Sequence, residues 1–163
     1  MTRVFISIGS NIEREKHIRA GVNSLTEHFG HLTLSSVYEA DAVGFNGEPF
    51  LNLIAALDTQ KTAAQVDLIF DQIEKQHGRT SEQKKFNPRT LDLDLVLYGD
   101  YISQNPELEI PRAEITRYAF VLEPLAEIAG DLKHPVLNTS YDELWQSFNK
   151  NGVVQRRIDF DWD

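Results

Sequence analysis

Apolar residues follow two different spacings along this chain, and the spacing changes several times. Alternating apolar and polar residues predict a half-buried β-strand, whereas apolar residues at every third or fourth position predict a helix. The first hundred residues predict six elements in this order: a strand at 4–8, a helix ending before Gly30, strands at 32–38 and 50–57, a helix between Thr62 and Gly78, and a strand at 91–98.

This order of strands and helices predicts an α+β fold on the ferredoxin-like βαββαβ plan. Such a fold is an antiparallel sheet with helices packed on it, here in α/β/α layers. The later residues predict a C-terminal extension with a helix over Tyr118–Ala129, a helix that follows Ser140 and a last strand over Val153–Ile158. We expect all 163 residues to form a single domain.

Several local signals refine these elements. Three pairs of residues predict capping boxes at helix starts, namely Ser10 with Glu13, Thr62 with Gln65, and Ser140 with Glu143. Ser35-Ser36 interrupts the second strand and predicts a bulge there. His17 lies away from the apolar stripe of the first helix and is predicted to be exposed, as is the acidic tail at 159–163.

The last of these six elements, the strand at 91–98, carries two acidic residues on one face. Alternation places Leu91, Leu93, Leu95 and Leu97 on one side and Asp92, Asp94, Val96 and Tyr98 on the other. The alpha carbons of the two aspartates are then roughly 7 Å apart, where like charges repel by about 2 kcal/mol. A divalent cation would relieve this repulsion, and oxygen ligands favour magnesium or manganese over zinc. A solvated strand shows the same alternation, so both interpretations are open at this stage.

A basic loop at 79–89 precedes this strand. It contains four basic residues and one acidic residue, in a chain whose net charge is −9. Acidic residues that hold a metal, next to cations that hold phosphate oxygens, suit a metal-chelated polyphosphate. The acidic face is also expected to carry Phe50 and Asn52 from the strand at 50–57. The sequence therefore predicts a ligand site on this side of the sheet.

The composition excludes several classes of protein. The net charge argues against broad binding to nucleic acids or anionic membranes. The chain has no cysteine, which excludes disulfides and thiolate zinc sites. No apolar run approaches the roughly 18 residues of a membrane span, and the alternating N-terminus does not fit a signal peptide. These features predict a cytoplasmic protein.

The motifs together resemble the 6-hydroxymethyl-7,8-dihydropterin pyrophosphokinases of the folate pathway. The run from Pro88 to Asp94, Pro-Arg-Thr-Leu-Asp-Leu-Asp, is the most specific of them. The other motifs that carry the resemblance are Gly9-Ser10-Asn11, Ser35-Ser36-Val37-Tyr38, Phe50-Leu51-Asn52, Gly78-Arg79, Phe120-Val121-Leu122 and Pro124-Leu125-Ala126-Glu127-Ile128-Ala129. The resemblance implies transfer of pyrophosphate from ATP to the hydroxymethyl group of the pterin, with release of AMP.

The resemblance also implies roles for particular residues. It implies catalytic roles for Arg79, Arg89, Asp92 and Asp94, with the two aspartates holding two Mg²⁺ ions. It implies ATP binding by Glu74, Arg89, Leu95, Arg112, Arg117 and Tyr118. It implies pterin binding by Val43, Phe50, Asn52, Phe86 and Phe120, where Phe86 stands in place of the family's usual tryptophan. The partners are then ATP and 6-hydroxymethyl-7,8-dihydropterin, and the protein is expected to be a monomer.

Some positions depart from the family pattern. Arg112 stands where a histidine is usual, while Ser81 and Tyr118 stand where arginines are usual. Arg112 is expected to replace part of this missing positive charge. Two alternatives follow: a paralogue that binds pterin or nucleotide without turning it over, and an unrelated ferredoxin-like interaction domain with a solvated acidic strand. The second predicts no effect of magnesium and no thermal shift with ATP analogues.

Overall fold

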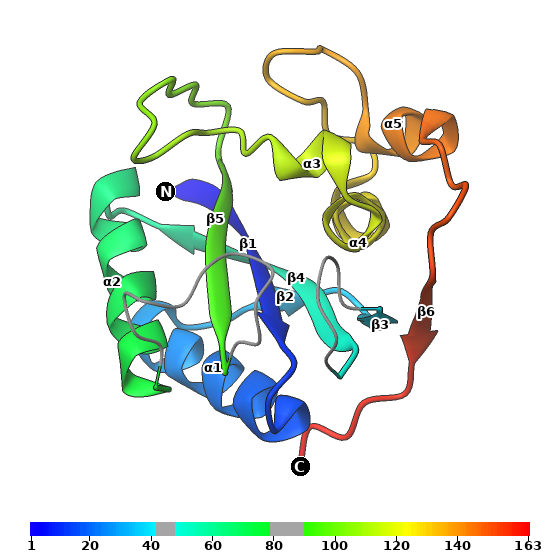
Figure 1. Ribbon diagram of the computed structural model, residues 1–163. Coiled ribbons are helices and arrows are strands. Elements are labelled where there is room, and N and C mark those ends of the chain that lie inside the picture. The colour runs from blue at the N-terminus through cyan, green and yellow to red at the C-terminus, as the bar shows by residue number, and fades with distance from the viewer. Residues whose placement is uncertain (42–47, 79–89) are drawn as a thin grey trace.

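The computed structural model describes residues 1–41, 48–78 and 90–163, and shows an antiparallel sheet with helices on both faces (Figure 1). The strands are β1 (Thr2–Ser10), β2 (Thr33–Leu34), β3 (Val37–Ala40), β4 (Phe50–Thr59), β5 (Asp92–Tyr98) and β6 (Gln155–Ile158). The helices are α1 (Arg14–Phe29), α2 (Ala63–Gln76), α3 (Glu114–Arg117), α4 (Ala119–Ala129) and α5 (Tyr141–Ser147). The predicted α+β fold and its order of elements are confirmed.

Two hydrophobic cores lie on opposite faces of the sheet. The strands run in the order β5-β1-β4-β3-β6, and β2 also pairs with β4. On one face, α1 and α2 bury Ile18, Leu25 and Phe70 against the sheet. On the other face, α4 and α5 bury Leu122 and Tyr141. The predicted α/β/α layering is therefore confirmed. No helix among the described residues is both long and apolar enough to cross a membrane.

A β-bulge corrects the predicted alternation in β5. Ile6 of β1 pairs with Leu95, but the preceding Phe5 pairs with Leu97, so Val96 is an extra residue in β5. Val96 and Leu97 consequently both join the core under α4, while Tyr98 packs against the core under α1 and α2. The expectation that Leu97 shares the face of Leu95, and Tyr98 that of the aspartates, is wrong because strict alternation cannot anticipate an inserted residue.

The helix starts bear out the capping predictions in part. Thr62 and Gln65 form the expected reciprocal box at α2, and the Ser140 side chain accepts from the Glu143 amide at α5. The predicted box at α1 is wrong. The N-cap of α1 is Glu13, and it makes no side-chain cap hydrogen bond. The hydroxyl of Ser10, which was predicted to cap this helix, instead donates to the Thr90 carbonyl. Ser10 thus joins the end of β1 to Thr90, two residues before the start of β5.

Two predictions of surface exposure and one predicted strand also need correction. His17 is buried rather than exposed, because its Nδ1 lies 2.7 Å from the Ile12 carbonyl oxygen and its ring packs on His77. The strand predicted at 32–38 is divided into β2 and β3 at Ser35-Ser36, where the bulge is expected. Most of the acidic tail is exposed, but Phe160 packs against the core under α1 and α2.

Candidate active site

A cleft lies on the α4 side of the sheet, where β5, β1 and β4 approach the start of α4. It encloses about 680 Å³ of empty space, including volume open to solvent. Its lining residues come from strands, loops and helices: Ser7, Gly9, Ala40, Asp41, Phe50, Asn52, Asp92, Asp94, Val96, Arg112, Glu114, Phe120 and Val121. The predicted acidic pair, the predicted amide and the two phenylalanines predicted to bind the pterin within the described residues therefore share one cleft.

Strand register explains why the acidic pair and the amide meet. Gly9 of β1 pairs with Asn52 of β4 on one side and with Asp92 of β5 on the other. The three residues form a row across the sheet, in which neighbouring strands are about 4.8 Å apart. Ser7 pairs with Asp94 in the same way, so the second aspartate lies two residues further along the same face.

Burial and the neighbouring charge of Asp92 favour the protonated form of the Asp94 carboxyl group. Burial, followed by the charge of Asp92, raises the pKa of Asp94 to about 7, and the Arg112 guanidinium opposes this shift. A divalent cation between Asp92 and Asp94 would replace the repulsion with attraction. Magnesium commonly binds through one or two carboxylates and takes its other ligands from water and phosphate. Asp92 and Asp94 offer two such carboxylates to the cleft. The described residues contain no group of three or more His, Cys, Asp or Glu side chains that could hold a metal ion.

The pKa of Asp94 leads to a prediction about stability without metal. The unfolded chain releases this proton near pH 4, whereas the folded protein keeps it up to about pH 7. The folded state therefore binds more protons between these values, and the free energy of unfolding should fall as pH rises through this window. In thermal denaturation with EDTA, Asp94→Asn should gain stability relative to wild type as pH rises from 4.5 to 8. A difference that does not change with pH would contradict this prediction.

Arg112 is held between two carboxylates at the cleft. Its Nε donates to Glu114 Oε2 at 2.5 Å, and its Nη2 lies 3.9 Å from Asp94 Oδ1. Its backbone amide donates to the Val96 carbonyl in β5, which ties the loop to the sheet. Glu114 was not among the site residues predicted from the sequence. Its signal was an acidic residue two positions after the predicted cation, a spacing too common to be informative by itself.

Two further predicted residues line a second cleft that adjoins the first. Arg117 and Tyr118 line this neighbouring cleft, which shares Ala40, Asp41 and Phe120 with the first. The Tyr118 ring stacks on Phe120, with centroids 5.0 Å apart and planes at 21°. Tyr118 therefore contributes an aromatic ring stacked on the cleft residue Phe120, and not the positive charge of the arginine that is usual at this position.

Two predicted nucleotide-binding residues are buried away from the cleft lining. The Leu95 side chain lies in the core under α1 and α2, so only its backbone could face a ligand. Glu74 is 3% exposed, and its Oε2 accepts a hydrogen bond of 2.7 Å from the Leu93 amide at the edge strand β5. The remaining predicted site residues, Val43, Arg79, Phe86 and Arg89, lie outside the described residues.

Comparison with known sequences identifies related proteins. Residues 5–130 match the profile of the family described as 7,8-dihydro-6-hydroxymethylpterin-pyrophosphokinase. A Pseudomonas aeruginosa protein named 2-amino-4-hydroxy-6-hydroxymethyldihydropteridine pyrophosphokinase is 36% identical over 139 residues, 82% of this chain and 84% of that protein. A Bacillus subtilis protein of the same name is 32% identical over 157 residues, 91% of this chain and 92% of that protein.

Solved structures show the same fold at lower sequence identity. A triple mutant of Plasmodium falciparum HPPK-DHPS with pteroate superposes with a TM-score of 0.75 at 12% identity, over 96% of this chain. An HPPK-DHPS described as in complex with substrates gives a TM-score of 0.72 at 10% identity, over 90% of this chain. This chain spans 46% and 45% of those two longer chains, so the likeness concerns one part of each.

Proposed function

The chain belongs to the 7,8-dihydro-6-hydroxymethylpterin-pyrophosphokinase family, and from this premise we propose that it transfers pyrophosphate from ATP to the hydroxymethyl group of 6-hydroxymethyl-7,8-dihydropterin in folate biosynthesis. The observation that carries the proposal is the meeting of Asp92, Asp94, Phe50, Asn52 and Phe120 in one cleft. A single-domain monomer located in the cytoplasm stays a prediction from the sequence.

The aromatic end of the cleft suits the pterin. Phe50 from β4 and Phe120 from α4 are partly exposed and line the cleft from the sheet and from the helix above it. A flat heterocycle between two aromatic rings gains stacking energy, and an amide can both donate to and accept from its polar edge. Asn52 is 5% exposed and lies in the row of residues next to the acidic pair. We therefore assign pterin stacking to the two phenylalanines and edge recognition to Asn52.

The acidic end of the cleft suits the metal-chelated phosphates of ATP. Asp92 and Asp94 would hold magnesium there, two ions in our proposal, which would neutralise the phosphates and align them for displacement. Arg112 provides a fixed positive charge beside Asp94. Arg79 and Arg89 of the basic loop remain part of the proposal from the resemblance, as does Glu74 next to the nucleotide.

The reaction needs positioning and neutralisation of charge more than covalent chemistry from the protein. The pterin hydroxyl oxygen bonds to the β-phosphorus of ATP, the bond from that phosphorus to the α,β-bridging oxygen breaks, and AMP leaves. The hydroxyl proton is released to solvent. The residues of this chain bind the two substrates so that the hydroxyl and the β-phosphorus meet between the aromatic and acidic ends of the cleft.

Release of AMP tests this proposal directly. AMP should form only when ATP, 6-hydroxymethyl-7,8-dihydropterin and magnesium are all present, and EDTA should stop it. AMP without the pterin would instead indicate hydrolysis of ATP. No AMP together with a clear thermal shift from pterin or an ATP analogue would favour the paralogue that binds without turnover, and restoring arginine at Ser81 and Tyr118 would then show whether activity returns.

Gly9 allows Asn52 to lie close to the sheet, which gives a prediction about the pterin. A Cβ placed on Gly9 would lie 2.8 Å from Asn52 Oδ1, so Gly9→Ala should turn the amide away. Because that atom is the far end of a side chain, the fold should survive. We expect the pterin KM to rise about tenfold, which is the loss of one to two hydrogen bonds, with little change in the ATP KM. Steady-state kinetics with each substrate varied would measure both, and equal rises in the two KM values would count against this role.

A further inference from the structure

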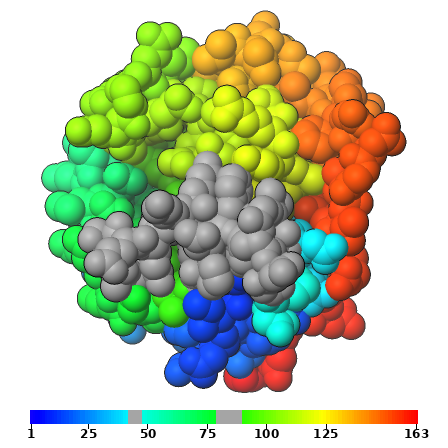
Figure 2. Space-filling view, viewed as in Figure 1, coloured from blue at the N-terminus to red at the C-terminus, as the bar shows by residue number. Residues whose placement is uncertain are grey.

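The last strand, β6, follows the part of the chain that matches the family profile. The match ends at residue 130, whereas β6 covers Gln155–Ile158. It pairs with the short strand β3 at the edge of the sheet (Figure 1). The orange and red surface of the C-terminal segment runs along one side of the molecule and lies against cyan residues (Figure 2). The C-terminal segment thus extends the sheet next to a strand that ends at the cleft.

On the cleft side, Gln155 joins β6 to the start of α4. Gln155 pairs with Ala40, which lines the cleft. Its Nε2 donates to the Ala119 carbonyl at 3.1 Å and to Glu123 Oε1 at 2.8 Å. Ala119 directly precedes Phe120, so one amide group connects the end of β3 to the helical wall of the cleft. In addition, the amide of Asp41, another lining residue, donates to the Val154 carbonyl.

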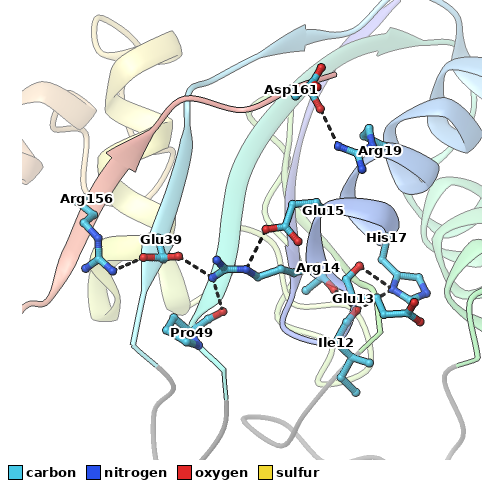
Figure 3. A network of polar contacts seen from close by, with 11 residues as sticks. Ile12, Glu13, Arg14, Glu15, His17, Arg19, Glu39, Pro49, Arg156 and Asp161 are labelled. Atoms are coloured by element: carbon cyan, nitrogen blue, oxygen red, sulfur yellow. Dashed lines mark hydrogen bonds and ion pairs between the residues drawn. The ribbon is translucent and has the colours of Figure 1, made fainter. Parts of the chain in front are cut away.

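On the opposite face, a chain of contacts through Glu39 and Arg14 links Arg156 of β6 to the residue before β4. Alternation turns Arg156 away from Gln155, where it pairs with the carboxylate of Glu39 (Figure 3). Glu39 Oε2 also accepts from Arg14 Nη1 at 2.7 Å, and the same Arg14 nitrogen donates to the Pro49 carbonyl at 3.1 Å. Pro49 directly precedes Phe50, the aromatic residue on the sheet side of the cleft.

The contacts of Gln155 reach Ala119, the residue before Phe120. The contacts that start at Arg156 reach Pro49, the residue before Phe50. We propose that β6 is a positioning element of the substrate site, and that Gln155 and Arg156 fix the spacing between Phe50 and Phe120. The inference rests on the proposed function, since it concerns the two rings assigned to the pterin. Stacking depends steeply on the separation and tilt of the rings, so a small shift of α4 relative to β4 should weaken pterin binding and leave the acidic end of the cleft intact.

The test is Gln155→Met, which keeps the length of the side chain and removes both donated hydrogen bonds. The pterin KM should rise about fivefold, the worth of about one net hydrogen bond, while kcat and the ATP KM change less than about twofold. Gln155→Lys retains N–H donors for Ala119 and Glu123 and should restore most of the pterin KM. Gln60→Met is the matched control, because Gln60 is exposed just after Thr59, the end of β4 that is distant from Phe50.

The outcomes separate this inference from the proposed function. If wild-type protein makes no pterin-dependent AMP, the proposed function fails first. If wild type is active and Gln155→Met has an unchanged pterin KM, only the positioning role is overturned. A loss of melting temperature with the two KM values rising together would also overturn it, because that result describes general loosening. Should Gln155→Met fail to fold, Arg156→Gln at an exposed position replaces it, with the same criteria.

Discussion

Replacing Asp94 with asparagine is expected to lower pterin-dependent AMP formation by about a thousandfold, since under the proposed metal assignment it would remove several kcal/mol of transition-state stabilisation. The variant should still fold. Asparagine keeps the shape of the side chain and removes a charge that Asp92 repels and burial disfavours. At pH 8 without metal, the variant should therefore melt at a higher temperature than wild type, although it is nearly inactive.

The combination of lost activity and gained stability distinguishes a metal ligand from a structural residue. Asp58→Asn provides the control, because Asp58 forms an exposed ion pair with Arg3 and its replacement should change neither activity nor stability by much. Magnesium should raise the melting temperature of wild type in the presence of an ATP analogue, and that rise should be absent in Asp94→Asn. Wild-type turnover by the Asp94 variant would refute the metal assignment.

Arg112→Met is expected to lower kcat/KM for ATP by about a hundredfold. The guanidinium is the cation next to Asp94 among the described cleft residues, and charge-assisted contacts to phosphate are roughly twice as strong as neutral hydrogen bonds. Its removal also leaves Asp94 and Glu114 without the positive charge that lies between them, so magnesium should become more important for stability. Steady-state kinetics with ATP varied at saturating pterin would measure the loss.

Two variants make the role of Arg112 specific. Arg112→His restores the residue that is usual at this position in the resembling family and should recover part of the activity. Glu114→Gln keeps a hydrogen-bond acceptor for Arg112 Nε but removes the charge, and should cost far less than Arg112→Met if Glu114 mainly holds the guanidinium in place. Equal losses in Glu114→Gln and Arg112→Met would indicate that Glu114 itself acts on the substrates or metal.

The helices and strands were predicted well because the sequence signals for each of them lie within that helix or strand. The apolar stripe of α1, the glycine at its end and the Thr62 capping box each depend on residues within one or two turns of a helix. The two aspartates of β5 were likewise predicted to share a face, since alternation needs only the strand itself. The bulge at Val96 was not predicted, because it depends on how β1 pairs with β5. His17 was misplaced for a similar reason: its burial depends on α2 and on the carbonyl of Ile12.

The sequence by itself determined which chemical groups are available: an acidic pair on one strand face, an amide and an aromatic residue on another strand, and a motif that is specific to a family. Only the tertiary structure decided which of these groups meet. Strand pairing placed Asp92 and Asn52 on either side of Gly9, and packing of α4 brought Phe120 over the same cleft. The contacts of Glu114 with Arg112, and of Gln155 with Ala119, depend on the same packing. Sequence patterns report each element's own periodicity, whereas contacts between elements depend on register and packing that no single segment encodes.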